Sequence, residues 1–148
     1  MQKIKNQIFD IYQIETLALS LCKKIKVGKV IMLKGDLGVG KTTLSRSIIN
    51  NLYSLNNLSK PNSIKSPTFP ILLTYDLLEY EIYHYDFYRI KNLKELEQLE
   101  FFEHLNNSIT LIEWPELLID LPFKEKYMLI NIKFHSDTKR NIDIKYFE

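Results

Sequence analysis

Residues 35–42 have the composition of a loop that binds phosphate. Their sequence, GDLGVGKT, fits the pattern G-x-x-x-x-G-K-[ST] and holds three of the chain's four glycines. Several backbone N–H groups can approach phosphate oxygens together only where few Cβ atoms intervene. In this motif the lysine reaches the β- and γ-phosphates and the hydroxyl ligates Mg²⁺. We therefore predict a site for a nucleoside triphosphate and Mg²⁺, with Lys41 on the phosphates and Thr42 on the metal.

The flanks of this motif favour a binding site over a plain glycine turn. A short apolar run precedes it, and a helical stripe of Leu44, Ile48, Ile49 and Leu52 follows it. The first amides of that helix and its partial positive charge would face the same anion. Thr43 is placed to add a hydrogen bond to the α-phosphate. The predicted nucleotide contacts are Gly35, Asp36, Leu37, Gly38, Val39, Gly40, Lys41, Thr42 and Thr43.

Two carboxylates are candidates for completing the metal site. Phosphate-loop proteins need an acidic residue at the end of a neighbouring buried strand. Asp86 ends the apolar run 82–85 and Glu113 ends the run 109–112, and the two residues are 27 positions apart. Adjacent strands would place both carboxylates beside Thr42. Either residue could instead cap its strand or pair with a lysine.

Four further side chains near these positions have open roles. Thr68, in the segment SPTF, is either a mobile threonine that binds Mg²⁺ or senses the γ-phosphate, or part of an ordinary proline turn. His84 lies two residues before Asp86 and so shares its strand face; it either hydrogen-bonds that carboxylate or is a structural histidine. For Arg89 we favour an acidic or partner contact over a role in catalysis. Trp114 is a core aromatic residue or an exposed partner contact.

The apolar pattern along the chain predicts the elements that hold these residues. Alternating or continuous apolar runs indicate strands, and apolar positions at helical spacing indicate helices, the first of which should end at Gly28. We expect strands over 3–11, 29–33, 69–75, 80–88, 109–113, 127–134 and 141–147, and helices over 14–26, from the phosphate loop to 54, and over 92–105. This order predicts a three-layer α/β/α domain of the phosphate-loop NTPase type over residues 1–148, with a mixed, partly antiparallel central sheet.

Composition narrows the class of protein. The chain has 148 residues, 45% hydrophobic and 26% charged, which suits a folded domain with a core. A net charge of +2 argues against a protein that wraps DNA or RNA. A single cysteine excludes an internal disulfide and a cysteine-rich zinc site, so we expect a reducing, cytoplasmic setting. No run approaches the ~20 apolar residues of a membrane span, and the N-terminus does not resemble a signal peptide.

The motifs taken together resemble a known family. The segments GDLGVGKTT, SPTF (66–69), HYDFYR (84–89) and IEWPE (112–116), in this order and spacing, are similar to those of TsaE (also called YjeE), the bacterial ATPase of threonylcarbamoyladenosine biosynthesis. The similarity extends from the first helix to Lys139-Arg140. Members usually have a glycine where this chain has Glu100, and often one at the end of the phosphate-loop helix, which this chain lacks.

The resemblance implies a function and partners. The family adopts a phosphate-loop NTPase fold, binds ATP with Mg²⁺ and hydrolyses it slowly. It works with two proteins that transfer a threonylcarbamoyl group to the adenosine beside the anticodon of tRNAs that read codons starting with A. It drives cycling of that complex, so tRNA contact is indirect. Carried over by motif, Lys41 and Thr42 bind phosphate and metal, Glu113 is the second metal ligand, Asp86 orients or activates the attacking water, and Thr68 acts as a switch.

Two other functions fit a phosphate loop less well. A small-molecule kinase is the main alternative, but it needs an acceptor site and usually an arginine-bearing lid, for which 148 residues leave little room. The other alternative is a GTPase switch or a non-hydrolysing nucleotide-binding scaffold; a GTPase would carry an Asn-Lys-x-Asp guanine signature, which the sequence lacks.

Overall fold

The computed structural model describes residues 3–120, 123 and 125–147. Strands and helices are interspersed along the chain as far as Ile119, and a strand pair follows. The elements are β1 (Ile4–Asp10), α1 (Ile11–Cys22), β2 (Val30–Lys34), α2 (Lys41–Leu55), β3 (Leu72–Asp76), β4 (Glu81–Asp86), α3 (Leu93–Gln98), α4 (Phe101–His104), β5 (Ser108–Glu113), α5 (Glu116–Ile119), β6 (Tyr127–Phe134) and β7 (Lys139–Phe147).

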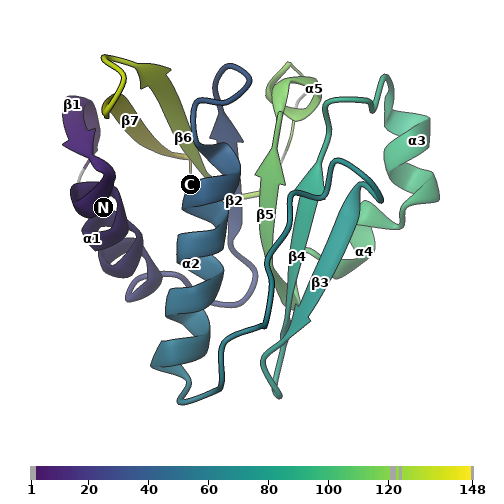
Figure 1. Cartoon of the computed structure of the whole chain (residues 1–148). Coiled ribbons are helices and arrows are strands. Elements are labelled where there is room, and N and C mark those ends of the chain that lie inside the picture. The colour runs from purple at the N-terminus through teal and green to yellow at the C-terminus, as the bar shows by residue number, and fades with distance from the viewer. Residues whose placement is uncertain (1–2, 121–122, 124, 148) are drawn as a thin grey trace.

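The strands of the described residues form one sheet in the order β1-β7-β6-β2-β5-β4-β3 (Figure 1). The central four strands, β6, β2, β5 and β4, are parallel to one another. The β1–β7, β6–β7 and β3–β4 pairs are antiparallel. The predicted mixed, partly antiparallel sheet is therefore confirmed.

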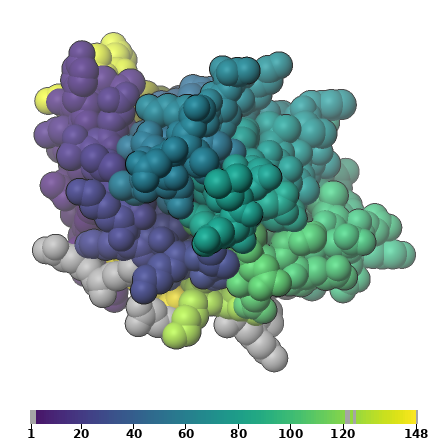
Figure 2. Space-filling model, turned by 90° about the horizontal axis from the view of Figure 1, so that it is seen from below, coloured from purple at the N-terminus to yellow at the C-terminus, as the bar shows by residue number. Residues whose placement is uncertain are grey.

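Helices cover both faces of the sheet, as a three-layer fold requires. In β2, Ile31 and Leu33 face a core built with α1 and α2, whereas Val30 and Met32 face a second core built with α3, α4 and α5. Figure 2 views the molecule from below, with α1 in purple at one side and the α3–α4 segment in green at the other. None of the helices in the described residues is long and apolar enough to cross a membrane.

The predicted helix faces are confirmed, but the ends of the first helix are not. The stripe on α2 (Leu44, Ile48, Ile49 and Leu52) is buried. α1 begins at Ile11 because Asp10 and Gln13 form a capping box, and it ends at Cys22. The expectation that Gly28 ends this helix is wrong. Gly28, at φ +82°, lies in the turn before β2, where its N–H donates to the Ser108 carbonyl at 2.8 Å.

The segment predicted as one helix over 92–105 is two helices. They are separated at Glu100, whose φ of +53° lies in the left-handed region. β3 also starts later than predicted, at Leu72, because Ile71 has a φ of +80° and ends the preceding turn. The short helix α5 after Glu113 has no counterpart among the predicted elements. At the end of α2, Asn57 takes a left-handed φ of +57°, which asparagine tolerates better than most residues.

Glu100→Gly should stabilise the protein. A left-handed backbone costs a residue with a Cβ roughly 1–2 kcal/mol, and glycine removes most of this cost while adding freedom to the unfolded chain. We expect the free energy of unfolding to rise by about 0.5–1 kcal/mol in urea titrations. The matched control is Glu97→Gly, at an exposed helical position in α3, which should lower it by about 1 kcal/mol. Equal destabilisation by both changes would contradict the strain at Glu100.

The thiol of Cys22 should not react while the protein is folded. The side chain is 4% exposed, and its Sγ contacts the Ile48 carbonyl at 3.4 Å. Burial raises the pKa of this thiol to about 12, so little of the reactive thiolate is present at pH 8. We expect no reaction with Ellman's reagent at pH 8 in buffer and one equivalent in denaturant. Rapid reaction of the folded protein would show that the α1–α2 core opens.

Candidate nucleotide-binding site

The parallel strands bring the predicted site residues to one edge of the sheet. β2 ends at Lys34 and leads into the loop 35–40, at the top of Figure 1. β4 ends at Asp86 and β5 ends at Glu113, and these two residues are partners in the β4–β5 register. The two carboxylates predicted to lie on adjacent strands therefore do so, at the carboxyl edge where α/β proteins bind ligands.

The loop before α2 has the backbone of a phosphate cradle. Gly38 and Gly40 have φ values of +74° and +115°, which glycine adopts without strain. Gly40 is the N-cap of α2 and makes no side-chain cap hydrogen bond, so the cap residue leaves the first amides of this helix available. Lys41 is buried, and its Nζ donates to the carbonyls of Gly35 at 2.6 Å and Asp36 at 2.9 Å. The ammonium thus lies over its own loop.

Burial and nearby carboxylates act in opposite directions on Lys41. Loss of water lowers the pKa of its ammonium, and the charge of Glu113 raises it less. The indole of Trp114 covers the same ammonium, with Nζ 3.8 Å from the ring centroid. Trp114 has a left-handed φ of +57° that turns the chain directly after β5. The negative charge of a bound anion would stabilise the protonated form of Lys41, which burial disfavours.

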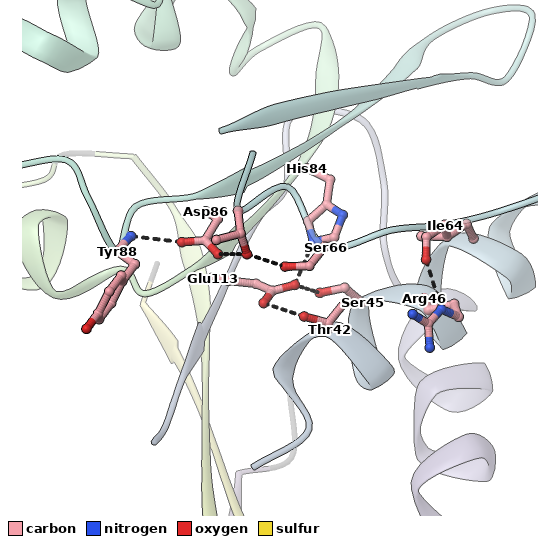
Figure 3. Close-up of polar contacts among 10 residues, drawn as sticks. Thr42, Ser45, Arg46, Ile64, Ser66, His84, Asp86, Tyr88 and Glu113 are labelled. Atoms are coloured by element: carbon pink, nitrogen blue, oxygen red, sulfur yellow. Dashed lines mark hydrogen bonds and ion pairs between the residues drawn. The ribbon is translucent and has the colours of Figure 1, made fainter. Parts of the chain in front are cut away.

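Glu113 joins α2 to the sheet (Figure 3). Its Oε2 accepts a hydrogen bond from Thr42 Oγ1 at 2.8 Å. Its Oε1 accepts from Ser45 Oγ at 3.3 Å and lies 2.7 Å from His84 Nε2. The carboxylate is 2% exposed, so these side chains replace the water that an ionised group requires.

Asp86 lies beside this group and holds the loop that contains Thr68. Its Oδ2 accepts from Thr68 Oγ1 at 3.2 Å, and its Oδ1 accepts from the Tyr88 N–H at 2.9 Å. Ser66 Oγ is 2.8 Å from Thr68 Oγ1. Thr68 therefore takes part in a side-chain network and does more than shape a proline turn.

The predicted metal and catalytic side chains line one cavity of about 180 Å³ in front of the phosphate loop. They supply hydroxyl and carboxylate oxygens, which are the ligands that Mg²⁺ prefers, and one lysine. The described residues that line it are Leu37, Gly38, Gly40, Lys41, Thr42, Thr43, Ser66, Thr68, Asp86, Glu113 and Trp114. The donor set therefore fits a magnesium ion held with phosphate.

A larger cavity of about 820 Å³ adjoins the other side of the loop. β1 and β6 run parallel to β2, so α1 and the β6–β7 turn start from the same edge as the phosphate loop. Ile11 and Ile14 of α1, Thr138 and Arg140 near the turn, and Gly38 line this cavity. Its position extends the phosphate site toward α1.

Several contacts of the site differ from the sequence-based interpretation. His84 contacts Glu113 and not Asp86. The Arg89 guanidinium donates to the Thr68 carbonyl and packs on Phe69, so its partner is a backbone group and not an acidic residue. Ser45 was not predicted, although its spacing of three from Thr42 places both hydroxyls on one face of α2.

A glycine loop between a buried parallel strand and a helix, with carboxylates ending the two strands that follow β2 in the sheet, defines the fold of the phosphate-loop NTPase class. Within that class the chain belongs to the TsaE family. Residues 9–142 match the family model described as "Threonylcarbamoyl adenosine biosynthesis protein TsaE". The resemblance inferred from the four motifs is therefore confirmed.

Curated relatives and a solved structure agree with this family. The chain is 38% identical over 123 residues to the tRNA threonylcarbamoyladenosine biosynthesis protein TsaE of Rickettsia typhi, covering 83% of this chain and 81% of that protein. It is 37% identical over 124 residues to TsaE of Haemophilus influenzae, covering 82% and 73%. The crystal structure of YdiB from Bacillus subtilis superposes with a TM-score of 0.65 at 23% identity, covering 100% of this chain and 90% of YdiB, and supports the fold.

Gly35→Ala should destabilise the protein through a clash with the backbone. A Cβ at Gly35 would lie 2.4 Å from the Ile132 carbonyl oxygen and 2.8 Å from Val39 Cγ1, so β6 would have to shift. We expect a loss of about 2–3 kcal/mol in the free energy of unfolding, measured without nucleotide. Gly38→Ala is the matched control. It has open space around its Cβ, so only its positive φ opposes alanine and the loss should be about 1 kcal/mol. Equal losses would mean that the Ile132 contact is unimportant.

Proposed function

We propose that the chain is a Mg²⁺-dependent ATPase, with one ATPase domain over residues 1–148, that supports formation of threonylcarbamoyladenosine in tRNA. The observation that carries this proposal is the convergence of Lys41, Thr42, Asp86 and Glu113 on one cavity at the phosphate loop. Membership of the TsaE family supplies the pathway. The modified base is the adenosine beside the anticodon of tRNAs that read codons starting with A.

Binding of ATP uses both cavities. The triphosphate lies along the loop amides, with Lys41 on the β- and γ-phosphates and Thr43 near the α-phosphate. The adenosine occupies the larger cavity, whose wall includes Ile11, Ile14 and Thr16. These three residues lie in the first half of α1.

Thr42 and Glu113 are the proposed protein ligands of Mg²⁺. When bound, the ion neutralises charge on the β- and γ-phosphates. The two side chains are already hydrogen-bonded to each other at 2.8 Å, so the ligand oxygens are brought together by the fold. The ammonium of Lys41, which lines the same cavity, stabilises the same phosphate charge.

Asp86 is the proposed residue that orients the attacking water. Water adds to the γ-phosphorus as the bond to the β–γ bridging oxygen breaks, and the proton of the water leaves toward a carboxylate or a phosphate oxygen. Asp86 Oδ1 accepts a hydrogen bond from the Tyr88 N–H, and Oδ2 accepts one from the Thr68 hydroxyl. Oδ2 has a second lone pair that can accept a hydrogen bond from water, and the contact of Thr68 with this same oxygen is the basis of its proposed switch role.

Basal hydrolysis should be slow, and partner proteins should set its rate. The chain has three arginines, Arg46, Arg89 and Arg140, and each donates to a backbone carbonyl. Among the described residues, no arginine lines the phosphate cavity. An arginine at the γ-phosphate is worth about 10³–10⁵ in rate. We propose that two subunits of a cytoplasmic threonylcarbamoyl-transfer complex are the partners, that hydrolysis drives cycling of the complex, and that tRNA contact is indirect.

Lys41→Ala and Glu113→Ala should each lower ATP hydrolysis by at least ~10²-fold, because each removes a group that stabilises phosphate or metal charge. Phosphate release with the partner subunits present measures the rate. Fluorescence of the single tryptophan, Trp114, measures ATP affinity with and without Mg²⁺. Lys133→Ala, at an exposed position on β6, is the control and should match the wild type.

Three outcomes would contradict this proposal. Full hydrolysis in the Lys41 or Glu113 variant would exclude their roles. A wild-type protein without Mg²⁺-dependent ATP affinity, even with its partners, would exclude the site. Transfer of phosphate to a small-molecule acceptor faster than hydrolysis would favour a kinase.

A further inference from the structure

His84 of β4 makes a buried contact with the candidate metal ligand Glu113. The imidazole is 0% exposed, and its Nε2 lies 2.7 Å from Glu113 Oε1. A carboxylate only accepts hydrogen bonds, so Nε2 carries a proton and donates it. Nδ1 is buried and has no hydrogen-bonding partner among the described residues. The polar contact of this ring is therefore directed at Glu113 alone within the described structure.

The two oxygens of Glu113 have different partners. Oε1 takes the short contact from His84 and the longer one from Ser45 at 3.3 Å. Oε2 accepts a hydrogen bond from the Thr42 hydroxyl at 2.8 Å, and Glu113 and Thr42 both line the phosphate cavity. His84 of β4 and Ser45 of α2 hold Oε1 in place. Oε2 is therefore left facing Thr42, where the phosphates would bind.

We propose that His84 is a positioning residue for the metal site. Its Nε2–H fixes the rotation of the Glu113 carboxylate, so that Oε2 and Thr42 Oγ1 stay together as oxygen ligands for the Mg²⁺ of a bound nucleotide. This inference rests on the proposed Mg²⁺–ATP site. Residues that hydrogen-bond to a metal ligand orient that ligand, and their loss typically lowers metal affinity or activity by about 10–100-fold.

The electrostatics of the cavity show why such a contact matters. Glu113 lies close enough to Lys41 for its charge to raise the pKa of that ammonium. Without the His84 donor, the carboxylate is free to rotate toward the ammonium and away from Thr42. Ser45 alone would hold Oε1, at a distance 0.6 Å longer than the His84 contact.

Two amide variants separate this role from a purely structural one. In His84→Gln, the amide nitrogen reaches about as far as the imidazole Nε2 and can still donate to Glu113. In His84→Asn, the same amide is one bond shorter and cannot reach. A histidine that serves stability alone would make both variants less stable without changing how nucleotide binding depends on Mg²⁺.

The measurement is ATP affinity from Trp114 fluorescence over a range of Mg²⁺ concentrations and in EDTA. We expect His84→Asn to raise the half-saturating Mg²⁺ concentration by about tenfold or more. Its ATP affinity in EDTA should match that of the wild type. His84→Gln should require Mg²⁺ at a concentration close to that of the wild type. Unchanged Mg²⁺ dependence in His84→Asn, or equal shifts in both variants, would overturn the inference.

Tyr85→Phe is the matched control on the same strand. Tyr85 is buried on the opposite face of β4, and its hydroxyl has no partner in the described residues. This variant should bind Mg²⁺ and ATP as the wild type does. If the wild type itself shows no Mg²⁺-dependent ATP binding, the proposed function fails. If the wild type does and His84→Asn behaves identically, only the role of His84 fails.

A measurement on the wild-type protein decides the question if His84→Asn does not fold. The Nε2 proton of His84, observed by NMR on protein labelled with ¹⁵N-histidine, should shift when ADP and Mg²⁺ are added together. It should shift much less with ADP in EDTA. Equal shifts under the two conditions would overturn the inference, because His84 would then sense the nucleotide and not the metal.

Discussion

The buried carboxylate of Glu113 is the group on which the arrangement of the site depends. Removing an ionised carboxylate from water costs on the order of several kcal/mol unless donors replace the water. Here the donors come from two elements, with Thr42 and Ser45 on α2 and His84 on β4. Thr42 and Ser45 are three residues apart and so share a helix face. The contacts that offset the burial of Glu113 therefore also orient the phosphate-loop helix against the ends of β4 and β5.

The three arginines of the chain hold the loops around the site through hydrogen bonds to backbone carbonyls. Arg46 donates to the Ile64 carbonyl, Arg89 to the Thr68 carbonyl and Arg140 to the Val39 carbonyl. Each contact ties down a segment that borders the nucleotide cavities. None of these three arginines lines the phosphate cavity. Among the described residues, Lys41 is then the basic side chain that lines the phosphate cavity, which agrees with the slow basal hydrolysis proposed above.

Short-range chemistry makes the strands, the phosphate loop and the strand-end carboxylates predictable from sequence. Glycines at positive φ and carboxylates that end apolar runs both have local signatures. Contacts between side chains that are distant in the sequence have no such local signature. His84 reaches Glu113 instead of Asp86 because alternate side chains along a strand are about 6.5–7 Å apart, whereas adjacent strands are about 4.8 Å apart. The left-handed break at Glu100 lies among helix-forming residues, so only the glycine usual in the family marks it.

Two of the six non-glycine residues with a positive φ in the described structure, Ile71 and Trp114, lie beside the candidate site. Ile71, a β-branched residue at φ +80°, donates to the Pro67 carbonyl at 2.8 Å and accepts from the Asp86 N–H at 2.9 Å. Trp114, at φ +57°, turns the chain just after Glu113 so that its ring covers Lys41. Such conformations persist only where the surroundings determine them strongly. Ile71 thus joins the end of the Thr68 turn to Asp86, and Trp114 directly follows Glu113, so a strained residue adjoins each of the two carboxylates of the candidate site.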